Sequence, residues 1–120
     1  MTVVTLVLGG TQDARERAIA TAIPKNFLCA AIIEGLPSGI NALDQLAPEL
    51  ELEVARVAPG CPCCTGNLTV RVTLNRLLKR APQQLYLSLL DATHRESVLA
   101  FLQEPQYRDR LVIGPDLRCE

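Results

Sequence analysis

The chain has 120 residues, of which 48% are hydrophobic and 21% charged, and this composition predicts one globular domain over residues 1–120. Twelve basic and thirteen acidic side chains give a net charge of −1, which leaves no basic footprint for nucleic acid or an anionic membrane. Because residues 1–10 lack the features of a signal peptide and no segment reaches the roughly twenty apolar residues of a membrane span, we expect a cytoplasmic protein.

The first third of the chain predicts a strand, a helix and a second strand. Thr2–Leu8 is a continuous run of β-branched residues and leucine, typical of a strand buried on both faces, and Gly9-Gly10 ends it. Residues 13–23 predict a helix with an apolar stripe of alanine and isoleucine, which leaves Arg15 and Glu16 mostly outside the core. Residues 27–33 form a second apolar strand, and Glu34-Gly35 follows it.

The middle of the chain predicts a short helix over 40–46 and a strand over 51–57. That strand alternates polar and apolar residues, which indicates one open face. A tight loop over 58–66 precedes apolar residues at helical spacing, which predict a helix ending before Pro82. The start of this helix is open, because residues 69–73 also alternate like a strand.

The C-terminal third predicts a strand over 85–90, a helix, and a short last strand at Leu111–Ile113. Thr93 and Glu96 have the spacing of a capping box, so we expect the helix to begin there and to stop before Pro105. The tail that follows Leu111–Ile113 is expected to be loose.

Strands that alternate with helices predict an α/β fold with three layers, in which helices flank a mostly parallel sheet of about five strands. Functional loops of such sheets follow the carboxyl ends of the strands. Here those loops cover residues 9–13, 34–39, 59–66 and 91–94, so we expect all of them at one edge of the sheet.

Most of the chemistry is concentrated in Cys61-Pro62-Cys63-Cys64. Thiolates at this spacing, between a strand and a helix, can bind one zinc or similar thiophilic ion. Tetrahedral zinc needs four ligands, so we expect Glu34 to complete the site, with His94 as a possible further ligand. For His94, a solvent-exposed position in the first turn of a helix is the favoured interpretation. Cys29 is expected in the core and Cys119 exposed in the tail.

The loop from Gly9 to Glu16 is a weak match to a phosphate-binding loop, which needs Gly-x-x-x-x-Gly-Lys-Ser/Thr. In that register Gly9 is retained, Ala14 replaces the second glycine, Arg15 replaces the lysine and Glu16 replaces the hydroxyl that holds Mg²⁺. The remnants of a nucleotide site are therefore at most Gly9, Gly10 and Arg15. For Arg15 the favoured interpretation is a charged, solvent-exposed side chain on the helix. We do not expect the protein to bind GTP.

The order of these segments, with Gly60-Cys61-Pro62-Cys63-Cys64 between a strand and a helix, resembles the CobW-type P-loop GTPases and metallochaperones. The resemblance covers most of the chain and implies a P-loop-NTPase-like fold. It also implies metal binding by Cys61, Cys63 and Cys64 with Glu34. The altered loop, and Leu89-Leu90-Asp91-Ala92-Thr93 where the family has Glu-Thr-Thr-Gly, indicate a pseudo-GTPase without catalytic turnover.

Three functional classes are compatible with these patterns. The first is a metal-binding or metal-delivery protein, whose partners would be the ion, a metal-receiving protein or a second copy. The second is a thiol–disulfide redox protein that uses Cys61 and Cys64. The third is a non-catalytic partner that docks on a full-length CobW-type GTPase.

Overall fold

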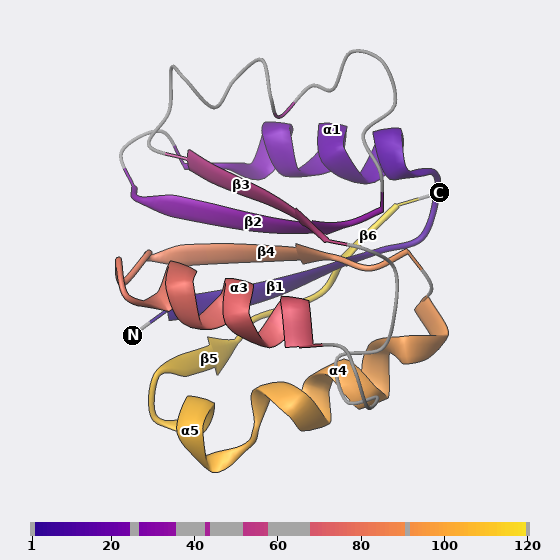
Figure 1. Ribbon diagram of the computed structural model, residues 1–120. Coiled ribbons are helices and arrows are strands. Elements are labelled where there is room, and N and C mark those ends of the chain that lie inside the picture. Colours follow the sequence, from indigo (N-terminus) through magenta and orange to yellow (C-terminus); the bar gives the residue numbers. More distant parts are fainter. Residues whose placement is uncertain are drawn as a thin grey trace.

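The strands of the protein pair in parallel, in the order β3-β2-β4-β1-β5 (Figure 1). The computed structural model describes residues 2–24, 27–35, 43, 52–57, 68–90 and 92–119. A short strand, β6, pairs with β1 beyond the end of β5. The strands are β1 (Thr2–Leu8), β2 (Cys29–Glu34), β3 (Leu52–Val57), β4 (Gln84–Ser88), β5 (Leu111–Ile113) and β6 (Leu117–Arg118). The expected α/β class with a mostly parallel sheet of about five strands is confirmed.

Helices cover both faces of this sheet. Figure 1 shows α1 (Gln12–Ala22) on one side and α3 (Leu68–Leu78) with α4 (Arg95–Leu102) on the other. Ile19 and Ile23 pack with one set of strand side chains, whereas Leu74 and Phe101 pack with the other set. None of the helices in the described part of the chain is long and apolar enough to cross a membrane. The helix expected over 40–46 lies outside the described residues except for Leu43, which is buried on the α1 side.

The buried face of α1 differs from the predicted alanine and isoleucine stripe. Arg15, Glu16 and Ile19 are buried, whereas the alanines of the helix are half-buried or exposed. Thr11 caps the helix, because its hydroxyl oxygen accepts a hydrogen bond from the Ala14 amide at 3.0 Å. The prediction that Arg15 and Glu16 lie outside the core is therefore wrong, and the contacts described below explain why these charges tolerate burial.

The two later helices correct the predicted boundaries. α3 is helical from Leu68 onward, which settles the ambiguity over 69–73, and Leu74, Leu77 and Leu78 face the core as expected. A 3₁₀ turn, η1 (Ala92–His94), precedes α4, so the helix begins at Arg95 with His94 as its N-cap. The Glu96 carboxylate accepts from Arg95 at 2.9 Å, and the side chain of the N-cap residue His94 makes no capping hydrogen bond in the described part of the chain. Pro105 begins a further short helix, α5 (Pro105–Arg108).

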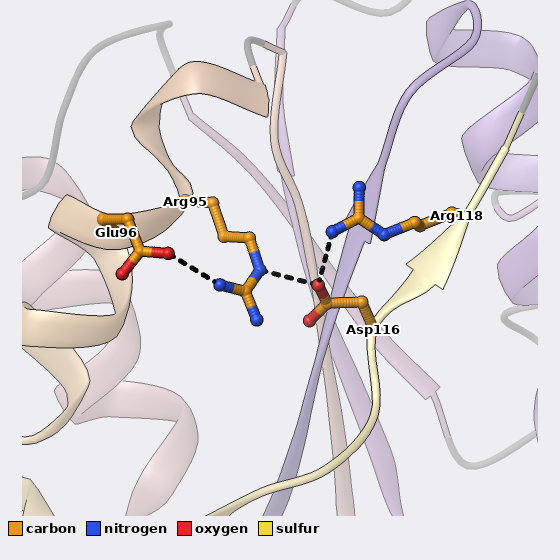
Figure 2. Close-up of polar contacts among 4 residues, drawn as sticks. All are labelled: Arg95, Glu96, Asp116 and Arg118. Carbon is orange, nitrogen blue, oxygen red and sulfur yellow. Dashed lines mark hydrogen bonds and ion pairs between the residues drawn. The ribbon is translucent and has the colours of Figure 1, made fainter.

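The C-terminal tail is ordered into β6, and the expectation of a loose tail is wrong. Figure 2 shows Asp116, just before β6, between the guanidinium groups of Arg95 and Arg118. The Asp116 carboxylate accepts from Arg95 Nε at 2.6 Å and from Arg118 at 3.3 Å. The bond to Arg95 links the residue just before β6 to the first turn of α4. β6 itself pairs with Val7 and Leu8 at the carboxyl end of β1.

Candidate functional site

The carboxyl ends of β3, β2, β4 and β1 lie next to one another at one edge of the sheet, because these four strands are parallel and consecutive in the sheet order. Glu34 ends β2 at this edge and is only 4% exposed. Its Oε1 accepts a hydrogen bond from the Leu90 amide at 2.7 Å. Glu34 is thus a buried carboxylate held in place at the edge where functional loops were expected.

Gly35 lets the chain turn closely against α1 immediately after Glu34. Its φ of +129° is disfavoured for residues with a side chain, and a Cβ there would collide with Gln12 Oε1. The Gly35 amide donates to the Val57 carbonyl at 2.9 Å, so the end of β2 is fixed to the end of β3. Glu34 itself is paired in register with Val57.

The predicted ligands Cys61, Cys63 and Cys64 lie outside the described residues, in the segment 58–67. The structure fixes both flanks of this segment, which leaves β3 at Val57 and enters α3 at Leu68. Cys29 is 1% exposed, which confirms its predicted place in the core, and burial raises the pKa of its thiol.

His94 is the last residue of η1, which follows β4 in the chain and begins at Ala92. It is half-buried, and among the described residues its Nδ1 has no hydrogen-bond partner. In the described ranges no three His, Cys, Asp or Glu side chains come together as a metal-binding group. The structure therefore does not bring His94 and Glu34 into such a group with a third described residue.

Arg15 is the main departure from the predicted site. It is 2% exposed instead of solvated. Its Nε donates to Ser88 Oγ at 3.0 Å, and one terminal nitrogen donates to the carbonyls of Gly9 and Gly10 at 3.1 and 2.9 Å. The other terminal nitrogen, Nη2, is buried and has no hydrogen-bond partner in the part of the chain that the structure describes. The guanidinium thus links the glycine loop to β4.

The surroundings of Arg15 compensate only in part for the burial of its charge. Burial lowers the pKa of the Arg15 guanidinium, and attraction to the anionic forms of Cys119, Glu34 and Glu16 raises it in part. These opposing effects indicate a buried cation that depends on nearby negative charge.

Glu16, at the position of the missing Mg²⁺ hydroxyl, forms a two-point ion pair with Arg56 of β3. The two N···O distances are 3.0 and 2.9 Å, and the exposed fractions of the Arg56 and Glu16 side chains are 16% and 1%. Gln12 Nε2 also donates to the Glu16 carboxylate at 3.3 Å. Sequence reasoning missed this pair because its members are 40 residues apart. The polar–apolar alternation of 51–57 favoured an open face for Arg56, so no local signal pointed to its partner.

Gly9 accommodates the C-terminal segment. Its φ is +83°, and a Cβ there would collide with the carbonyl oxygen of Cys119. The Cys119 amide donates to the Leu8 carbonyl at 2.7 Å, and the thiol lies 3.9 Å from the Ala14 carbonyl oxygen. Cys119 is half-buried against the glycine loop, so the expectation of an exposed tail thiol is wrong.

Comparisons with protein-family models, curated proteins and solved structures found no match to this chain.

Proposed function

We propose that this protein binds one zinc or similar thiophilic ion through two or three of Cys61, Cys63 and Cys64, with Glu34 as a further ligand. The observation that carries the proposal is the position of Glu34. Its backbone is paired in register with Val57, the last described residue before the segment that contains the three cysteines. A carboxylate and three potential thiolates are therefore joined to neighbouring ends of two paired strands.

The pleat of the sheet supports this arrangement. Side chains alternate between faces along a strand, so Glu34 shares a face with Ile32, which packs in the core beneath α3. The segment 58–67 is followed in the chain by α3, which packs on that same face of the sheet. Thiolate and carboxylate are both established zinc ligands, and a thiol near a helix N-terminus ionises more readily.

The contacts of Arg15 and Glu16 support a role without nucleotide turnover. In phosphate-binding loops the lysine reaches the terminal phosphates and the hydroxyl holds Mg²⁺. Here the Arg15 guanidinium is bonded to the loop's own carbonyls, and the Glu16 carboxylate is bonded to Arg56. Neither side chain can take its nucleotide role without breaking buried polar contacts.

We expect no Mg²⁺-dependent binding of GTP or ATP, because a triphosphate would have to displace Arg15 and approach the Glu16 carboxylate. Isothermal titration calorimetry of the reduced protein with each nucleotide, in the presence and absence of Mg²⁺, checks this. Micromolar binding that requires Mg²⁺ would contradict the assignment, and accompanying hydrolysis would restore the GTPase interpretation.

The metal proposal is tested by loading reduced protein, purified without a histidine tag, with Zn²⁺ and removing unbound ion by gel filtration. The expected result is one ion per chain, with two or three thiols protected from a chromogenic thiol reagent until a chelator is added. Protein that retains no ion and shows the same thiol reactivity with and without Zn²⁺ would contradict it. Formation of a reversible Cys61–Cys64 disulfide in such protein would then favour the redox interpretation.

A further inference from the structure

Residues 115–119 run along the carboxyl end of β1 and over the glycine loop, and we call them the strap. Within the strap, β6 pairs with the last two residues of β1. The Cys119 amide donates to the Leu8 carbonyl at 2.7 Å. The carbonyl oxygen of Cys119 lies so close to Gly9 that a Cβ at Gly9 would collide with it. The strap therefore closes the glycine loop from the side of β6.

A break in the pairing separates the strap from β5. β5 pairs with the first three residues of β1 and β6 with the last two, so the two pairings are not continuous. The Gly114 amide donates to the Val4 carbonyl at 2.8 Å, which fixes the end of β5 just before the break. Pro115 has no amide hydrogen and cannot extend this pairing. The strap can therefore leave β1 without disturbing β5.

The strap has few buried contacts of its own. Leu117 and Cys119 are half-buried at the margin of the core on the α1 side, whereas Val7 of the same core is fully buried. Arg118 is exposed. Local opening costs least where little apolar surface is buried and hydrogen bonds are few. We therefore expect the strap to open more readily than the central strands of the sheet.

The Asp116 carboxylate ties the strap to α4 (Figure 2). It accepts a hydrogen bond from Arg95 Nε at 2.6 Å and one from Arg118, within the strap itself, at 3.3 Å. The exposed fraction of the Asp116 side chain is 11% and that of the Arg95 side chain is 32%. Hydrogen bonds between ionised groups are shorter and stronger than neutral ones. The contact with Arg95 thus supplies stability that two residues of β6 lack.

We propose that the strap opens as a unit while the sheet stays folded, that the contact between Asp116 and Arg95 is its latch, and that opening uncovers the glycine loop at Gly9. In the closed state the Cys119 carbonyl lies against Gly9, and the Cys119 thiol lies beside the first turn of α1. Opening removes both groups from the loop whose carbonyls bind the Arg15 guanidinium. The latch thus controls access to that loop, and it does so independently of the proposed metal site.

The test is native-state hydrogen exchange of the reduced full-length protein, followed residue by residue by NMR. The Cys119 amide reports on the strap. The Leu89 amide, which donates to the Val7 carbonyl at 3.0 Å, reports on the central strands β1 and β4. We expect the protection factor of Cys119 to be at least about 100-fold lower than that of Leu89. Low concentrations of urea should accelerate exchange at Leu89 and hardly change it at Cys119, because opening of the strap exposes little surface.

Asp116→Asn tests the latch, because it keeps the shape of the side chain and removes the charge. It should lower the protection of Cys119 about fivefold, since the closed state loses a hydrogen bond between ionised groups. Leu89 should lose protection by the same factor, because global unfolding also breaks the latch. Glu96→Gln is the matched control: it alters the other partner of Arg95, whose side chain is 84% exposed, and should change the protection of Cys119 less than about twofold.

Two further variants separate the strap from the sheet. Cys29→Ala weakens the core at β2, so it should lower the protection of Leu89 and leave that of Cys119 unchanged. Gly9→Ala places a Cβ against the Cys119 carbonyl, so it should leave the Cys119 amide nearly unprotected while Leu89 stays protected.

Four results would overturn the proposal. Equal protection of Cys119 and Leu89, with the same dependence on urea, would mean that the strap opens only when the whole protein unfolds. A Cys119 amide without measurable protection would mean that the strap is not closed. Unchanged Cys119 protection in Asp116→Asn would exclude the latch, and a protected Cys119 amide in folded Gly9→Ala would exclude the contact with the glycine loop.

Discussion

Replacing Arg56 by Met should lower the free energy of unfolding by about 3–5 kcal/mol, because it leaves the Glu16 carboxylate buried without its cation. Glu16 is 1% exposed, and its other described contact is the amide of Gln12. The pair also joins α1 to β3 across the edge of the sheet. Chemical denaturation followed by circular dichroism measures the loss.

Two further variants separate the buried charge from general damage. Arg17→Met breaks only the exposed pair with Asp13 and should cost at most about 0.5 kcal/mol. The double variant Glu16→Met with Arg56→Met removes both charges and should recover much of the stability lost in Arg56→Met. A single Arg56→Met loss below about 1 kcal/mol, or a double variant no more stable than the single one, would contradict this account of the pair.

The double replacement Cys63→Ser and Cys64→Ser should abolish zinc binding at micromolar concentrations while the protein remains folded. A serine hydroxyl is a poor zinc ligand, and the variant leaves at most Cys61 and Glu34 of the proposed set. The fold should persist because the described core is built on both faces of the sheet by residues outside the cysteine segment. Zinc competition with a chromophoric chelator and a denaturation curve measure the two effects.

Cys29→Ala is the control for this experiment. Cys29 is buried in β2, so its replacement should cost some stability and leave zinc affinity unchanged. Zinc binding that survives in Cys63→Ser with Cys64→Ser, or is lost in folded Cys29→Ala, would place the ligands elsewhere.

The central strands could be predicted because β1, β2 and β4 are largely buried, and runs of β-branched residues and leucine have few alternatives there. Thr2–Leu8 is predicted to the residue, and Cys29–Glu34 within a few residues. β6 could not be predicted, because two residues carry no periodicity and the strand depends on the Arg95 contact with Asp116, 21 residues away.

The candidate site was only partly predictable for a related reason. Glu34 was identified because an acidic residue ends an apolar strand, and the structure places it at the expected edge. Arg15 was assigned to solvent because helical periodicity treats charge as a sign of exposure. Its burial depends on Ser88, 73 residues away, and a single polar residue within the strand at 85–90 was the sole hint of that partner.

Thiolate ligation is tested most directly by the absorption spectrum of the reduced protein with Co²⁺, which replaces Zn²⁺ in tetrahedral thiolate sites. The metal-site account predicts intense sulfur-to-cobalt charge-transfer bands that saturate at one ion per chain, disappear on addition of Zn²⁺, and are absent in Cys63→Ser with Cys64→Ser. A spectrum that stays that of hydrated Co²⁺ throughout the titration would contradict it.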